Sequence, residues 1–441
     1  MSGQARAVPC PWGAVGTTET HGSLRWGTMS FQIRPLSRAD RPASSTLGAE
    51  AFGTVPAPPE AEWPPAGHSP WGTFDGATLA ARAFRRAYTS WFGGASVPTN
   101  GLAGVTVAAE YRGRGLLGPL IGQVLADGRA AGDVISTLFA SAPGIYHRLG
   151  YALLTSYDVV EIPTTAAAAV RLEDPARGPG PSADSTTGPA DPAVTTRRAT
   201  AADGEAIARL YDRWAAAQNG PLTRTGPNFP PTELTREFTG VSVATGPDGL
   251  LQGYVSWDRG RQEGPDAALT VHDLIATTPG AYRVLWRLLG SFAPVLGVIR
   301  LRTSGADVAR LFLPPAAWRT IVTDPYMLRL DDVAAAFTLR RLVLSRDVVF
   351  SVTGDTVGVM DGTYLLTAGE EGATCRRIGA AAEAPPGAPV YTPPGIALAW
   401  AGAQSSANIR MAGGLTGGDE ATDAAFDRAL GGWQVHIRDA F

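Results

Sequence analysis

Hydrophobic positions near residue 100 follow a strand period and then change to a helical one. Residues 102–108 (LAGVTVA) predict a strand. After the turn Tyr111–Gly115, one face of a helix is marked by Leu117, Leu120, Ile121, Val124 and Leu125. Proline is tolerated only in the first turn of a helix, so Pro119 places the helix start directly after that turn. A strand over 134–140 and a short helix over 145–149 complete the unit.

The same order of patterns returns later in the chain. Residues 196–214 repeat the strand and capped helix of residues 33–48, and a strand over 269–275 precedes a helix over 281–292. The second copy lacks the arginine- and glycine-rich turn of the first. The pattern therefore predicts two related α/β halves, of which only the first has a turn with the glycines and arginines that could bind a ligand.

The hydrophobic pattern changes near residue 313. From there the sequence predicts a helix over 330–337, many short strands and turns, and a helix over 420–433. A stretch rich in Gly, Pro, Ser and Asp over 173–192 reads as a surface excursion. The predicted organisation is α+β, with four segments: a disordered extension at 1–28, an α/β domain at 29–158, a degenerate α/β domain at 159–312, and an α+β domain at 313–441.

Composition narrows the function classes. The 441 residues are 44% hydrophobic and 17% charged, which is typical of a globular protein, and a net charge of -3 argues against nucleic-acid binding by bulk positive charge. All 37 basic residues are arginine. The absence of lysine excludes a P-loop lysine, a Schiff-base lysine and a lysine general base, and is typical of a GC-rich, actinobacterial type of genome.

Cysteine and histidine give no sign of a metal or disulfide framework. Cys10 and Cys375 are the only cysteines, and the five histidines form no metal-ligand motif, so no metal is expected. These features suit a reducing cytoplasm. The most apolar window, 288–299, is shorter than the ~18 residues of a membrane span and contains Pro294.

The glycine turn admits two functional interpretations. Gly113, Gly115 and Gly118 fit the dinucleotide fingerprint, with Asp133 at the distance of a ribose ligand. Three polar residues nevertheless separate the strand from Gly113, and Asp133 comes before the second strand. The alternative is an anion cradle at a helix N-terminus, strengthened by neighbouring arginines, and a purely structural turn also stays open.

The order V-x-V, R-G-x-G-L-L, helix, strand and tyrosine-bearing short helix resembles the GNAT acetyltransferase superfamily. Arg112 and Gly115 match its Q/R-x-x-G-x-G/A pattern, while Leu117 replaces the final small residue. Together with the segment 141–151 (SAPGIYHRLGY), this RGLL variant resembles the enhanced intracellular survival (Eis) branch. The resemblance covers Met29 to Phe441 and implies two tandem GNAT domains, the second degenerate, a sterol-carrier-like third domain, and a homohexamer.

The Eis resemblance also implies an activity: acetyl transfer from acetyl-CoA to a primary amine in a direct ternary complex. It implies Tyr146 as general acid and the terminal carboxylate of Phe441 as base. Aminoglycosides, polyamine-like molecules and lysine-containing peptides are the implied acceptors. The implied acetyl-CoA contacts are Val105, Thr106, Val107, Arg112, Gly113, Arg114, Gly115, Leu116, Leu117, Gly118, Ser141 and Ala142.

This assignment is chemically reasonable, because a phenol of pKa ~10 donates well to a departing thiolate of similar basicity. Without the resemblance, Tyr146 reads as a core residue and Phe441 as a packing contact at a chain end. His147 is expected at the surface, His436 is a candidate pocket residue, and Asp439 is the rival carboxylate. Glu60 and Glu62 are candidate contacts for a cationic acceptor. A non-catalytic acyl-CoA or lipid carrier and a nucleotide-dependent oxidoreductase remain the alternative functions.

Overall fold

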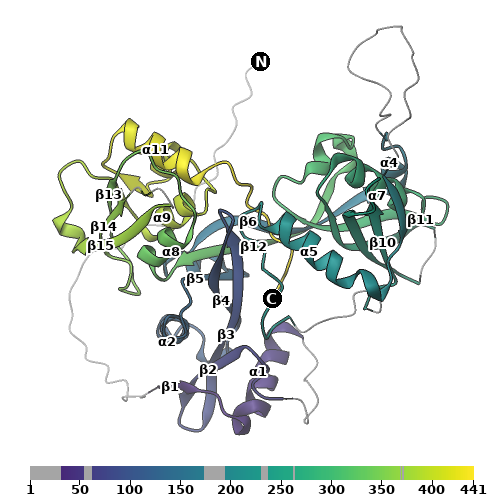
Figure 1. Cartoon of the computed structure of the whole chain (residues 1–441). Coiled ribbons are helices and arrows are strands. Elements are labelled where there is room, and N and C mark those ends of the chain that lie inside the picture. Colours follow the sequence, from purple (N-terminus) through teal and green to yellow (C-terminus); the bar gives the residue numbers. More distant parts are fainter. Residues whose placement is uncertain are drawn as a thin grey trace, which may run out of the picture.

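The chain folds around one long mixed sheet, with a smaller sheet beside it (Figure 1). The structure is a computed structural model that describes residues 31–53, 62–172, 194–229, 237–261, 264–367, 369 and 372–441. The predicted extension at 1–28 and the excursion at 173–192 lie outside the described residues.

The first half follows the predicted order of strands and helices. A bulged antiparallel run leads into the helix after the glycine turn, then into a short central strand and the short helix that carries Tyr146. The elements are β1 (Gln32–Pro35), α1 (Arg41–Phe52), β2 (His68–Asp75), β3 (Thr78–Phe92), β4 (Ala95–Val107), α2 (Leu117–Ala130), β5 (Ile135–Phe139), α3 (Pro143–His147) and β6 (Ala152–Pro163). Pro119 lies in the first turn of α2, as predicted.

The second half repeats that order after the short helix α4 (Thr164–Ala168), which confirms the prediction of two related halves. Its elements are β7 (Thr195–Arg198), α5 (Gly204–Ala215), β8 (Gly240–Thr245), β9 (Leu251–Arg259), β10 (Gly264–Ala276), α7 (Pro279–Gly290), β11 (Leu296–Ser304) and β12 (Arg319–Leu330). Each half opens with the same device, a bidentate ion pair from the first strand to the aspartate that caps its helix: Arg34 with Asp40, and Arg197 with Asp203.

The two halves exchange their last strands. The order in the twelve-stranded sheet is β1-β2-β3-β4-β5-β12-β6-β11-β10-β9-β8-β7. Strand β12 of the second half pairs antiparallel with β5, and β6 of the first half pairs with β11. The predicted boundary at residue 313 leaves β12 with the third domain, whereas its hydrogen bonds place it in the large sheet.

The third domain is α+β, with the sheet order β15-β14-β13-β16-β17. Its elements are α8 (Val333–Leu339), β13 (Val348–Val352), β14 (Gly362–Thr367), β15 (Thr374–Gly379), β16 (Val390–Tyr391), α9 (Pro393–Trp400), α10 (Ser406–Met411), β17 (Leu415–Thr416) and α11 (Glu420–Leu430). It shares a core with the first half, because the Phe92 and Trp400 rings lie 4.6 Å apart between centroids. Its sterol-carrier-like character stays a prediction.

After α11 the C-terminal segment leaves the third domain and crosses toward the middle of the molecule (Figure 1). Backbone bonds tie it to the loop after α5: Asn219 N donates to Gln434 O, and His436 N donates to Asn219 O, each at 2.8 Å. The last residue of the segment, Phe441, contacts Phe139 of the first half, so the segment touches both halves of the large sheet. Among the helices of the described ranges, none has the length and apolar character needed to cross a bilayer.

Candidate functional site

Strands β4 and β5 separate after a short parallel contact. They pair only from Thr99–Gly101 to Ile135–Thr137, although β4 continues to Val107 and β5 to Phe139. A bulge opposite Ala83, where Gly104 has φ 59°, turns β4 away from its neighbour. The β5-facing backbone groups at the end of β4 therefore lie along an open gap between the two strands.

The glycine turn lies directly after this gap and before α2. Gly113 and Gly115 have φ values of 77° and 73°, which only glycine adopts without strain. Gly118 is helical, and a Cβ built there would meet no atom within 4 Å apart from its chain neighbours and the backbone of its own helix. Packing therefore does not require a glycine at 118, and the backbone at the start of α2 is open to a ligand.

Two arginines flank the turn at the surface. Arg112 Nε donates to Val107 O at 3.4 Å, and Arg114 Nη2 donates to Glu110 O at 2.9 Å. Exposed amides, a helix N-terminus and cationic side chains together fit an anion such as the diphosphate of acetyl-CoA.

The dinucleotide interpretation of the same turn is wrong. Asp133 is buried, and Arg85 holds it through Nε at 2.5 Å and Nη2 at 2.9 Å, so its carboxylate is not free for a ribose. Strand β4 also pairs antiparallel with β3 rather than opening a parallel sheet. The fingerprint match is a coincidence of glycine spacing.

Tyr146 lies on α3 with only 8% of the residue's surface exposed. It packs in one cluster with Leu138 of β5 and Ala140 just after that strand, and its ring is 6.0 Å from that of Tyr151. Burial raises the pKa of the Tyr146 phenol, so the group stays protonated at neutral pH.

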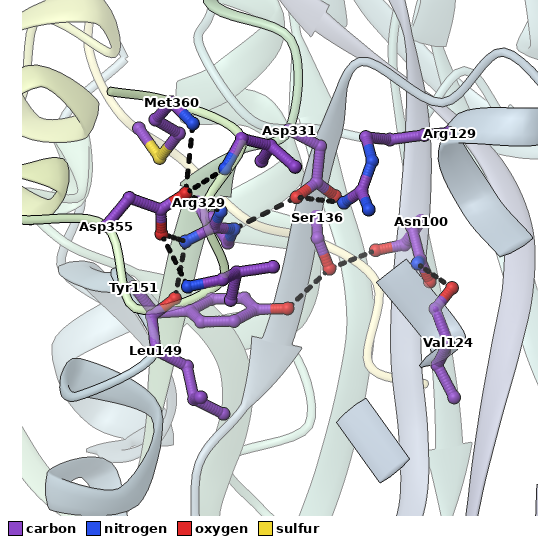
Figure 2. Close-up of polar contacts among 12 residues, drawn as sticks. Asn100, Val124, Arg129, Ser136, Leu149, Tyr151, Arg329, Asp331, Asp355 and Met360 are labelled. Atoms are coloured by element: carbon purple, nitrogen blue, oxygen red, sulfur yellow. Dashed lines mark hydrogen bonds and ion pairs between the residues drawn. The ribbon is translucent and has the colours of Figure 1, made fainter. Parts of the chain in front are cut away.

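The segment after α3 is held by a buried polar network that sequence reasoning missed (Figure 2). Arg329 of β12 donates from Nη1 to Leu149 O at 2.6 Å and to Asp355 at 2.8 Å, while its Nε donates to Asp331 at 3.0 Å. Both side chains of the Arg329–Asp355 pair are fully buried. The exchanged strand and the third domain thus position the segment that carries Tyr146.

Phe441 reaches the gap between β4 and β5 from the other face of the sheet. Its ring lies 4.9 Å from Tyr88 and 5.3 Å from Phe139 between centroids, and a Cβ on Gly101 would come within 2.9 Å of it. Neighbouring residues of a strand face opposite sides, so Phe139 contacts Phe441 while Leu138 packs with the cluster of Tyr146. The structure therefore places these two candidates on opposite faces of the sheet beside the same gap.

The rival carboxylate is already engaged. Asp439 accepts from Arg224 Nε at 2.9 Å and from the Tyr211 hydroxyl at 3.2 Å. Burial raises the pKa of Asp439, although Arg224 opposes this. The Asp439 carboxylate thus serves a structural ion pair with the second half.

The remaining candidates are dispersed. Ser141 and Ala142 are exposed at the start of α3, His147 is exposed as predicted, and His436 is buried beside a cavity in the second half. Glu62 is exposed, and Glu60 lies outside the described residues. Among the described residues, the structure gathers no three histidine, cysteine or carboxylate side chains in a metal-binding arrangement.

Comparisons with known proteins agree on one family. The family model described as acetyltransferase (GNAT) domain matches residues 32–154, and a second model with the same description matches residues 220–330. An uncharacterized N-acetyltransferase from Streptomyces avermitilis is 32% identical over 327 residues, covering 69% of this chain and 73% of the relative.

Solved structures show the same fold along nearly the whole chain. The GCN5-related N-acetyltransferase from Kribbella flavida aligns with a TM-score of 0.73 at 23% identity, covering 93% of this chain and 98% of that one. Eis1 from Mycobacterium abscessus aligns with a TM-score of 0.70 at 24% identity, covering 93% of this chain and all of the other.

Proposed function

This chain belongs to the GNAT family of N-acetyltransferases, and we propose that it transfers acetyl from acetyl-CoA to a primary amine, with Tyr146 as general acid and the Phe441 carboxylate as base. Transfer is direct, with both substrates bound at once. The observation that carries the proposal is the seating of Phe441 against Gly101 and Phe139, beside the gap between β4 and β5.

Acetyl-CoA would bind along β4 and the glycine turn. The diphosphate would lie on the amides at the start of α2, beside Arg112 and Arg114, and the thioester would enter the gap between the strands. Backbone N–H groups at the end of β4, over 105–107, would donate to the carbonyl oxygen as it gains negative charge.

The reaction needs two proton transfers, and the proposed base and the proposed acid lie on opposite faces of the large sheet. The acceptor amine must lose a proton to attack, and the Phe441 carboxylate would receive it directly or through water. The departing thiolate needs a proton, and the Tyr146 phenol, whose pKa is raised by burial, keeps one to donate.

The proposed acceptor class rests on the Eis-like architecture. It does not rest on a pocket whose charge complements a cationic amine. Aminoglycosides, polyamine-like molecules and lysine-containing peptides all present a primary amine on a cationic body. A carboxylate base at the gap would attract such a group as well as deprotonate it.

The experiment is thiol release from acetyl-CoA, measured with the full chain and an unmodified C-terminus against a panel of these three amine classes. Release that depends on an acceptor supports the proposal and names the class. Acetyl-CoA binding without release for every acceptor would contradict the proposed reaction on these amines and favour an acyl-CoA carrier.

A further inference from the structure

The second half contains a cavity of about 410 Å³ at the position that matches the proposed acetyl-CoA site of the first half. It lies at the end of β10, the start of α7 and the turn after β11, which correspond to β4, α2 and the α3 region. Its walls include Trp214, Ala276, Tyr282, Leu311, His436 and Arg438.

This cavity has lost the features that fit coenzyme A. Strands β10 and β11 pair up to Val271 and Leu301 and then separate, but the C-terminal segment fills the space between them. Arg438 Nη1 donates to Arg302 O of β11 at 2.8 Å, and its Nε lies 3.6 Å from Asp273 of β10. The connection to α7 is Thr277–Thr278 without a glycine, and Pro279 at the helix start has no N–H to offer a diphosphate.

The cavity nevertheless presents buried polar atoms that lack partners. Arg438 is 4% exposed and His436 is 7% exposed, and both line the cavity. Neither Arg438 Nη2 nor His436 Nδ1 has a hydrogen-bond partner among the described residues. A buried guanidinium N–H without an acceptor is costly, so a bound oxygen anion would be favoured there.

Asp307, the carboxylate among the described residues that line the cavity, does not meet this need. Asp307 accepts from the Tyr282 hydroxyl at 2.9 Å, from Thr303 Oγ1 at 2.5 Å and from Ala309 N at 2.8 Å. Burial and the neighbouring Arg438 lower the pKa of His436 to about 3, so its imidazole is neutral at pH 7. The group on the wall that still needs an acceptor is therefore the Nη2 donor of Arg438, whose guanidinium charge is already shared with Asp273.

We propose that this cavity is a second ligand site, which binds a small molecule with one carboxylate on an aromatic or aliphatic body. The carboxylate would accept from Arg438 Nη2, and the apolar body would lie against Trp214 and Tyr282. Cavities of this volume hold ligands of roughly drug-fragment size. The proposal concerns binding alone and holds whether or not the first half transfers acetyl groups.

The test is isothermal titration calorimetry on the full chain with saturating acetyl-CoA, so that the proposed site in the first half is occupied. The probes are indole-3-butyrate and its uncharged amide, indole-3-butyramide. The acid should bind one per chain and about tenfold or more tighter than the amide, because only the acid forms a charge-assisted bond to Arg438. Equal binding of both, or no binding of the acid at millimolar concentration, would overturn the proposal.

Variants locate the probe. Arg438→Gln should weaken the acid about tenfold or more and leave the amide unchanged, whereas the control Arg376→Gln, an exposed position on β15, should change neither. Leu311 is 85% exposed at the rim and can be changed without disturbing the core. Leu311→Glu should bind the acid several-fold more weakly than Leu311→Gln, through like-charge repulsion. Identical binding by these two rim variants would contradict the location.

Discussion

At the scale of single residues, a substitution of Gly118 should have opposite effects on helix stability and on acetyl-CoA binding. Neither a positive φ nor a close contact requires glycine there. Gly118→Ala should therefore stabilise α2, by up to about 1 kcal/mol. The added methyl would lie over the amides proposed to hold the diphosphate, so acetyl-CoA affinity should fall about tenfold.

Gly122 offers a matched control, because it lies one turn further along α2 and a Cβ there would also meet nothing within 4 Å. Gly122→Ala should stabilise the helix and leave acetyl-CoA affinity nearly unchanged. Calorimetric titration and thermal unfolding of both variants check the pair. If Gly118→Ala binds acetyl-CoA as the wild type does, the cradle is assigned to the wrong turn.

His436 makes a second prediction at this scale, for stability against pH. The folded protein keeps His436 neutral, with a pKa lowered to about 3 by burial and by Arg438, opposed by Asp307. The unfolded chain takes up that proton below about pH 6.5. The neutral His436 therefore makes its full contribution to the free energy of unfolding above pH 6.5. This contribution is lost as the pH falls, by roughly 2 kcal/mol at pH 5.

Urea unfolding at pH 7 and pH 5 measures this loss in the wild type and in His436→Gln. Between pH 7 and pH 5, the free energy of unfolding of His436→Gln should therefore fall by about 2 kcal/mol less than that of the wild type. Asp331, whose pKa burial raises to about 6, acts in the opposite direction but is present in both proteins. The exposed His147→Gln control should behave like the wild type, and a His436→Gln curve parallel to the wild type would refute the assignment.

At the scale of elements, α3 depends on residues far away in the sequence. Arg329 bonds Leu149 O just after α3, and Thr356 of the third domain bonds Arg148 O at 2.7 Å. Arg329→Gln should cost roughly 3–5 kcal/mol of stability, because it leaves Asp355 buried without its cation.

The same variant tests whether Arg329 positions Tyr146. The turnover number should fall while acetyl-CoA affinity stays near that of the wild type. Arg410→Gln is the matched control, since the Arg410–Asp423 pair is partly exposed and should be worth less than about 1 kcal/mol. A stability loss with an unchanged turnover number would leave Arg329 a purely structural role.

Sequence periodicity predicted most elements of the first half, because each has its own hydrophobic pattern. The start of α2 could also be predicted, because Pro119 is tolerated only in the first turn of a helix. The periodicity did not predict the exchange of β6 and β12. Strand partners are chosen by contacts across the whole chain, and β12 has polar residues such as Arg319 and Asp324 where its local pattern resembles a loop. The Arg329 network was missed for the same reason, since its members lie on β12, on the α3 segment and in the third domain.

At the scale of the whole molecule, the C-terminal segment links all three parts. It leaves α11, lines the cavity of the second half with His436 and Arg438, and ends with Phe441 beside the gap in the first half. The Eis resemblance predicted a role for Phe441, but the sequence alone could not predict the route of the segment. The third domain therefore delivers the chain end to the proposed site.

The central claim is that the carboxylate of Phe441 is the base, and the most direct measurement compares three proteins that differ only at that group. These are the unmodified chain, a chain made as its C-terminal amide by ligation, and Phe441→Ala, which keeps a carboxylate. The amide should lose acetyl transfer by about a hundredfold or more and keep acetyl-CoA affinity, while Phe441→Ala should retain more activity than the amide. Tyr146→Phe should show the same split between turnover and affinity. An amide that turns over as fast as the unmodified chain would contradict the mechanism.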